Sequence, residues 1–88
     1  MTLVKFGSQI DYIPSNIGAH FPNLEAMNVG GKNLKSIRRE NFKFMTKLNS
    51  LHLENNLISE LNEDTFVDLI NLETLELRYN KIRSLPKM

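Results

Sequence analysis

The chain has 88 residues, a formal net charge of +1 and a hydrophobic content of 41%. This length suits one small domain, and the near-neutral charge gives no general attraction to nucleic acid or to anionic membranes. The sequence has no cysteine, which excludes disulfides and thiolate metal sites, and no apolar run long enough to insert into a bilayer.

Residues 1–23 start with an apolar–polar alternation around Val4 that is typical of a short strand, followed by Ile10 and Ile13. These apolar positions match positions in the segments that follow, although Val4 precedes its counterpart Met27 by 23 residues rather than 24. One residue is therefore missing from the turn after this strand. We expect an irregular terminal repeat here.

A pattern with a period of 24 residues runs through the rest of the chain, and Leu24, Leu48 and Leu72 open its three cycles. From Leu48 the sequence reads L-x-x-L-x-L-x-x-N-x-I-x-x-L-x-x-x-x-F-x-x-L. A fixed period with apolar residues in the same positions indicates a solenoid, in which no repeat buries its apolar face alone. The three cycles cover residues 24–47, 48–71 and 72–88.

Each cycle has a strand half and a return half. Residues 27–29, 51–53 and 75–77 alternate apolar and polar side chains, as short strands do. Parallel strands at identical register need a return path, and the second half of the cycle supplies it, with Phe42 and Phe66 predicted to point inward.

Asn56 and Asn80 follow the strands of the second and third cycles and are predicted to be structural turn residues. Stacked one per repeat, their side chains would satisfy buried loop amides that have no partner in the sheet. Lys32 occupies this position in the first cycle, so the asparagine series is expected to be broken there unless Asn33 substitutes.

This pattern resembles the leucine-rich repeat family, and the period and the phenylalanine resemble its typical 24-residue subclass. The resemblance covers residues 24–85 closely and 3–22 loosely. It implies that the whole chain is one domain with an α/β-type solenoid fold. The expected solenoid is a short curved horseshoe. It has a parallel β-sheet on its concave face and mostly irregular, turn or short helical segments on its convex side. It also implies ligand contact mostly on the concave face.

The compartment is suggested by the resemblance alone, which favours an extracellular or secreted parent. Residues 1–7 lack the basic and apolar regions of a signal peptide, so the protein either stays inside the cell or is a mature or trimmed form. The cysteine-rich caps common in secreted family members are absent. We therefore expect the chain to be a fragment of a longer protein or a designed piece.

The polar residues that point outward from adjacent strands form columns, because parallel strands lie about 4.8 Å apart. Tyr79 beside Arg78 is a combination of residue types enriched in binding hot spots. We expect a protein partner to bind these two residues and their column neighbours through the concave face. The alternative is a solvated face in which Glu54 and Arg78 form a weak pair across strands. The group consists of His52, Glu54, Glu76, Arg78 and Tyr79.

Catalytic and metal chemistry have little support in the sequence. His52, Glu54 and Glu76 can be combined into a metal site on paper, but zinc needs three or four converging ligands and this face is open. The sequence contains no G-x-S-x-G, glycine-rich phosphate loop or H-E-x-x-H motif. We expect a non-catalytic protein-interaction module without cofactor or metal, and neither nucleic-acid binding nor membrane insertion.

Charges are segregated by repeat. Six basic residues and one acidic residue lie between Lys32 and Lys47, whereas residues 54–76 contain seven acidic residues and no basic one. Since Arg39, Glu63 and Lys87 are equivalent in the 24-residue period, the favoured hypothesis is an alternating charge ladder that supports stacking. The alternative is a basic convex patch that recruits an acidic partner.

The third cycle stops after its turn, and the first and last strands are predicted to be unpaired edges. Open edges and half-covered apolar residues favour pairing between chains. The alternative function is therefore a self-associating structural or designed repeat unit that forms homodimers or larger oligomers through its ends. The apolar residues concerned are Leu72, Leu75, Leu77, Ile82 and Leu85.

Overall fold

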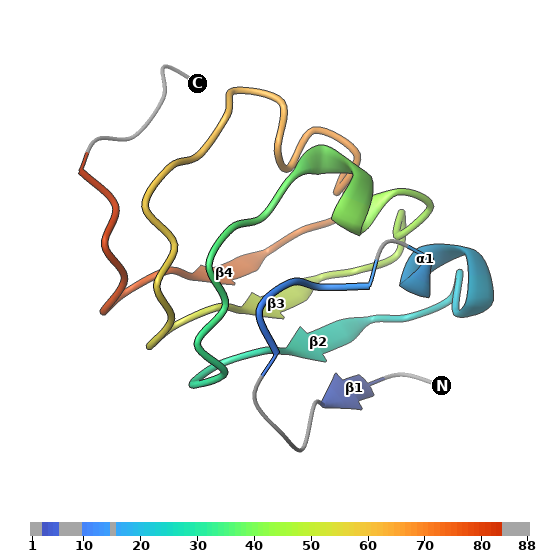
Figure 1. The fold of residues 1–88 in the computed structure, drawn as a ribbon. Helices are drawn as coiled ribbons and strands as arrows, with labels where there is room; N and C mark the ends of the chain where they lie inside the picture. Colours follow the sequence, from blue (N-terminus) through green and yellow to red (C-terminus); the bar gives the residue numbers. More distant parts are fainter. Residues whose placement is uncertain (1–2, 6–9, 15, 84–88) are drawn as a thin grey trace.

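The computed structural model describes residues 3–5, 10–14 and 16–83 of the chain. Its parallel strands lie side by side in the order β1-β2-β3-β4, and the segments between them return on the other side of the sheet (Figure 1). The predicted α/β-type solenoid with a parallel sheet is thus confirmed. The strands are β1 Leu3–Lys5, β2 Ala26–Asn28, β3 Ser50–His52 and β4 Thr74–Glu76.

The strand register follows the sequence period. Met27 pairs with Leu51, and Leu51 pairs with Leu75, each an offset of 24 residues. Val4 pairs with Met27, an offset of 23 residues. The missing residue was predicted in the turn after β1, and residues 6–9 of that turn lie outside the described part of the chain.

The return segments contain little regular structure. The first contains the short helix α1, Ile17–His20, and the second contains the 3-10 helix η1, Arg39–Phe42. Asn41 accepts a hydrogen bond from the Arg38 amide at 2.7 Å, and its equivalent Thr65 accepts one from the Asn62 amide at 3.1 Å. Both side chains are buried, so this position fixes the turn before the inward phenylalanine in both repeats.

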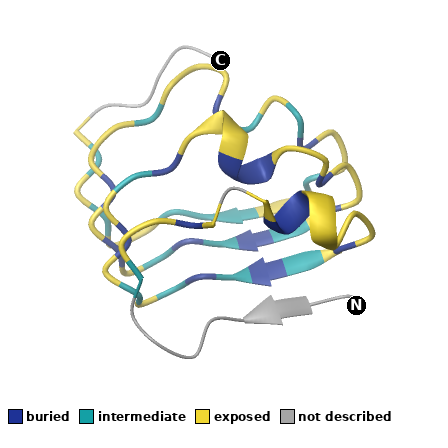
Figure 2. Cartoon of the chain, turned by 45° about the vertical axis from the view of Figure 1, so that its right-hand side comes forward, coloured by how far each residue is buried: buried dark blue, intermediate teal, exposed yellow. Residues whose placement is uncertain are grey.

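The core lies between the sheet and the return segments. Leu24, Leu48, Met27 and Leu51 are completely buried, and the rings of Phe42 and its equivalent pack with centroids 5.7 Å apart. Figure 2 shows buried positions on β2, β3 and both short helices. Each fully buried leucine contributes roughly 1.5–3 kcal/mol to folding, so the repeat positions account for the shape of the core. The second member of the aromatic pair is Phe66.

The predicted charge ladder named the wrong partner for Arg39. Arg39 does not pair with Glu63: its Nε and Nη2 atoms donate to the two carboxylate oxygens of Asp68 at 3.0 and 3.1 Å. A guanidinium group favours this two-bond geometry over a single contact with a long side chain. The hydrogen bond from Arg39 lowers the pKa of Asp68 below its usual range. Lys87, the third predicted member, lies outside the described residues.

Candidate functional site on the concave face

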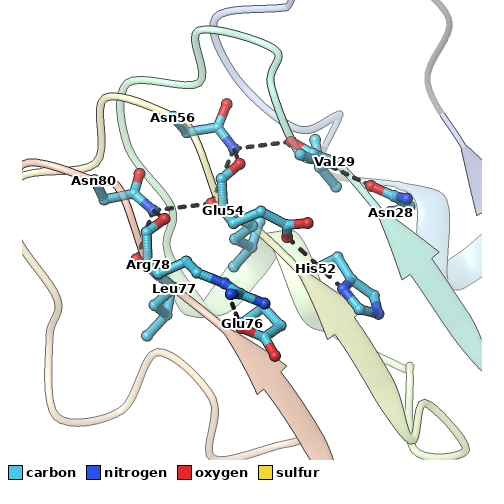
Figure 3. A network of polar contacts seen from close by, with 11 residues as sticks. Asn28, Val29, His52, Glu54, Asn56, Glu76, Leu77, Arg78 and Asn80 are labelled. Carbon is cyan, nitrogen blue, oxygen red and sulfur yellow. Dashed lines mark hydrogen bonds and ion pairs between the residues drawn. The ribbon is translucent and has the colours of Figure 1, made fainter.

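The five predicted binding residues come from two neighbouring strand exits. His52 ends β3 and pairs in register with Glu76, which ends β4. Glu54 follows β3 by two residues, and Arg78 follows β4 by two residues (Figure 3). Tyr79 comes next along the chain. His52, Glu54 and Glu76 are half-buried. Arg78 and Tyr79 are exposed and are therefore the most accessible members of the group.

Neighbouring side chains of this group contact each other within each strand exit. Arg78 Nε lies 3.2 Å from Glu76 Oε1, and His52 Nδ1 lies 3.7 Å from Glu54 Oε1. The predicted pair between Glu54 and Arg78 is therefore wrong. Figure 3 shows the two contacts as separate dashed lines on adjacent strands.

Glu54 extends toward the preceding repeat rather than toward Arg78, because the equivalent residue of that repeat is Gly30. A Cβ atom on Gly30 would lie 3.2 Å from the Glu54 Cδ atom, so the carboxyl group occupies space that a side chain would otherwise take. The Gly30 amide donates to Asn28 Oδ1 at 3.0 Å. Asn28 and Gly30 were not predicted as part of the site. The 24-residue spacing of Gly30 and Glu54 was the feature of the sequence that could have indicated their contact.

One oxygen of this carboxyl group is buried without a hydrogen bond. Among the described residues, Glu54 Oε1 has no donor, and the His52 ring is too far away at 3.7 Å to count as one. Desolvating a carboxylate oxygen without a donor costs free energy. The position of Glu54 is therefore not explained by its contribution to folding.

Tyr79 adopts a left-handed backbone conformation that is unfavourable for tyrosine. Its φ of 60° matches Gly31 at 68° and Asn55 at 59°, the equivalent residues of the two preceding repeats. Glycine and asparagine tolerate this left-handed region, whereas a bulky residue is strained there by roughly 1–3 kcal/mol. The Tyr79 side chain is 72% exposed, so burial does not offset the strain.

Asn56 fixes the strand exit that carries Glu54. Its Nδ2 donates to the carbonyls of Val29 and Leu53 at 2.8 and 3.0 Å. Its Oδ1 accepts the amides of two residues of the preceding repeat, at 3.0 and 2.9 Å. One amide thus satisfies backbone groups of two repeats (Figure 3). The two amide donors belong to Lys32 and Leu34.

Asn80 does the same one repeat later, donating to Leu53 and Leu77 and accepting the Ile58 amide at 3.1 Å. The asparagine series begins at Asn56, because within the described ranges the exposed Asn33 side chain makes no hydrogen bond. Asn56 and Asn80 each accept amides of the preceding repeat, and by this pattern an asparagine at position 32 would accept the Ile10 amide. That amide donates instead to the Lys32 backbone carbonyl at 3.0 Å.

The site offers no metal or membrane geometry in the part of the chain that the structure describes. No three His, Asp or Glu side chains converge closely enough there to hold a metal ion. Among the same residues, no helix has the length and apolar character needed to cross a bilayer.

A stack of parallel strands with asparagine-bonded exits and short return segments defines a leucine-rich-repeat solenoid. The family model described as leucine rich repeat matches residues 22–86, and the chain belongs to the leucine-rich repeat family. The predicted resemblance is therefore confirmed.

The chain is similar to several curated proteins. Human epiphycan is 44% identical over 55 residues, which cover 62% of this chain and 17% of that protein. Human opticin is 43% identical over 53 residues, covering 60% and 16%. Human leucine-rich repeat and fibronectin type III domain-containing protein 1 is 34% identical over 68 residues, covering 77% and 9%. The chain thus spans less than a fifth of the length of these relatives.

Proposed function

We propose that the chain is a non-catalytic protein-interaction module that binds a partner protein through the concave patch, defined as His52, Glu54, Glu76, Arg78 and Tyr79. The observation that carries this proposal is Tyr79, an exposed aromatic side chain on a strained backbone beside a Glu76–Arg78 ion pair. Strain of this kind is found where function rather than folding selects the residue.

The chemistry of the concave patch supports a protein ligand. Tyrosine and arginine are the residue types that most often dominate binding energy at protein interfaces. Glu76 is held by its ion pair with Arg78, and His52 and Glu54 are half-buried, so these side chains lose less conformational freedom on binding than fully exposed ones do. We propose that Tyr79 is the anchor and that the carboxylates select the polar groups around it.

We also propose that the parent protein is extracellular or secreted. One relative from Macaca fascicularis, 33% identical over 61 residues that cover 69% of this chain and 14% of that protein, is named trophoblast glycoprotein. A glycoprotein passes through the secretory pathway, and the proposal extends that route to this chain.

A displayed protein library, selected on the immobilised chain, provides the partner for the test. We expect Tyr79→Asn to weaken binding at least about tenfold, the loss of one hot-spot anchor, and Arg78→Ala to weaken it as well. Tyr12→Asn is the matched control, because Tyr12 is a 61% exposed aromatic residue of the first return segment. Unchanged affinity in both concave-patch variants would reject the proposal.

Self-association is the second candidate function, and one observation favours it. Leu72, Leu75 and Leu77 remain half-buried, whereas their equivalents one repeat earlier are completely buried. Two copies of the chain that pack these apolar layers together would remove them from water. Light scattering over a dilution series tests this: an apparent mass that falls on dilution is expected, and a constant monomer mass at high concentration excludes it.

A further inference from the structure

A second candidate surface lies on the return side of the molecule. A shallow groove of about 300 Å³ is lined by Gly18 and Ala19 of α1, Pro22 and Phe44. The Phe44 side chain is 63% exposed, and nearby Phe21 is 39% exposed. These residues lie outside the concave patch and have no part in the function proposed above.

The groove depends on a close approach between α1 and the turn after η1. A Cβ atom on Gly18 would overlap the Lys43 carbonyl oxygen, so only glycine permits this packing. Lys43 has φ −59° and ψ 141°, and Phe44 has φ 68°. The Met45 amide donates to the Phe42 carbonyl at 3.3 Å, which completes a type II turn.

Phe44 occupies the turn position that normally requires glycine or asparagine. The corresponding turn of the next repeat closes with a 3.0 Å bond from Leu69 to Phe66, and its equivalent residue Asp68 does not have a positive φ. The strain at Phe44 is thus particular to this repeat. Because the residue is 63% exposed, packing offsets little of this strain.

Lysines lie in one of the two segments that build the groove. Residues 42–47 contain Lys43 and Lys47, and neither this segment nor residues 16–23 contains a carboxylate. Asp68 of the next repeat lies close enough for the charge of Lys43 to help lower its pKa. In the described part of the chain neither lysine makes an ion pair, whereas Lys35 and Arg39 of the same basic run pair with aspartates. The groove therefore combines an apolar lining with two lysines in the segment that carries Phe44.

We propose that this groove docks an acidic protein segment that inserts one large apolar side chain beside Phe44. The groove provides space for the side chain, and the two lysines near Phe44 in the sequence complement carboxylates that flank it in the partner segment. An anionic bilayer is less suited, since polybasic membrane surfaces use clusters of roughly four to eight Lys or Arg residues. The partner class is thus a protein segment rather than a lipid surface.

The test uses a synthetic peptide with a central leucine flanked on both sides by glutamates, titrated into the isotope-labelled chain and followed by NMR. We expect shifts of the Gly18, Ala19 and Phe44 amides and weaker binding at higher ionic strength. Phe44→Asn should reduce the affinity at least about tenfold. This variant retains the turn because asparagine tolerates a positive φ, so its melting temperature should not fall. Ile70→Asn, at a 74% exposed apolar residue of the next repeat, is the control.

Three results would overturn the proposal. The first is no binding of the peptide, and the second is equal affinity for a peptide with a central alanine. The third is equal binding by the folded Phe44→Asn variant. Binding to phosphatidylserine vesicles without binding to the peptide would also overturn it and would assign the surface to membranes.

Discussion

At the scale of single residues, the most informative comparison is among Gly31, Asn55 and Tyr79. These equivalent residues share a left-handed backbone, with φ values from 59° to 68°. Glycine and asparagine tolerate that conformation, whereas tyrosine does not. The sequence period brings them into one column, but a period of apolar and polar residues does not report φ. The strain at Tyr79 was therefore not predictable without the structure.

Tyr79→Asn should raise the free energy of unfolding by about 1 kcal/mol, because asparagine relieves the left-handed strain and little buried surface is lost. Urea denaturation measures this change. The reciprocal variant Asn55→Tyr introduces the same strain in the preceding repeat and should lower the free energy of unfolding by a similar amount. A loss of stability in Tyr79→Asn would show that the tyrosine is retained for packing.

Asn56→Ala should lower the free energy of unfolding by at least about 2 kcal/mol, because it leaves two backbone amides and the Val29 carbonyl without partners. The Leu53 carbonyl keeps its bond from Asn80. Asn80→Ala should cost about half as much, since Asn80 accepts one amide rather than two and is less buried. Equal and small effects in both variants, measured by urea denaturation, would mean that water replaces the asparagine side chains.

At the scale of elements, the return segments are joined by the Arg39–Asp68 pair rather than by the predicted ladder through Glu63. The six basic residues and the acidic block were visible in the sequence, and their sign alternation holds in this contact. Which carboxylate Arg39 meets depends on the path of the turn after Phe66, and the repeat pattern does not define that path. The alternative pairing of Glu54 with Arg78 fails for a different reason, because Glu54 contacts Gly30 and His52 while Arg78 pairs with Glu76.

The Asp68 pair predicts a specific acid dependence of stability. Because Arg39 lowers the Asp68 pKa in the folded chain, the pair stabilises the fold above the unfolded pKa, near about 3.9. This contribution disappears as the pH falls through the lower folded pKa. Asp68→Asn should therefore lose stability at neutral pH and show a shallower decline below about pH 4.

Glu63→Gln is the matched control, since it removes a carboxylate of the same repeat that does not bind Arg39. Urea denaturation across a pH series should give the same acid profile for this variant as for the unaltered chain. If Glu63→Gln and Asp68→Asn change the profile equally, the acid dependence reflects total charge rather than the pair.

At the scale of the whole molecule, most of the fold was predictable because burial in a solenoid repeats with the sequence. The period gave the strand register, including the 23-residue offset of the first strand. It also predicted the inward phenylalanine pair that the structure contains. The contact of Gly30 with Glu54 follows the same 24-residue spacing, whereas the position of α1 against the η1 turn depends on irregular loops that no pattern in this sequence indicates.

The uneven burial of equivalent leucines should appear in their contributions to stability. Leu51→Ala should cost roughly 2–5 kcal/mol, as expected for a completely buried leucine. Leu75→Ala should cost less, because Leu75 is only half-buried and leaves a smaller cavity. Calorimetry of both variants at low concentration checks this order, and a larger loss for Leu75→Ala would indicate that its layer is covered by another copy.

The most direct measurement for the proposed function is the NMR footprint of a selected protein partner on the labelled chain. Binding through the concave patch predicts that the largest shifts occur at His52, Glu54, Glu76, Arg78 and Tyr79. A footprint confined to the return segments, with these five residues unchanged, would contradict the assignment of function to the concave face.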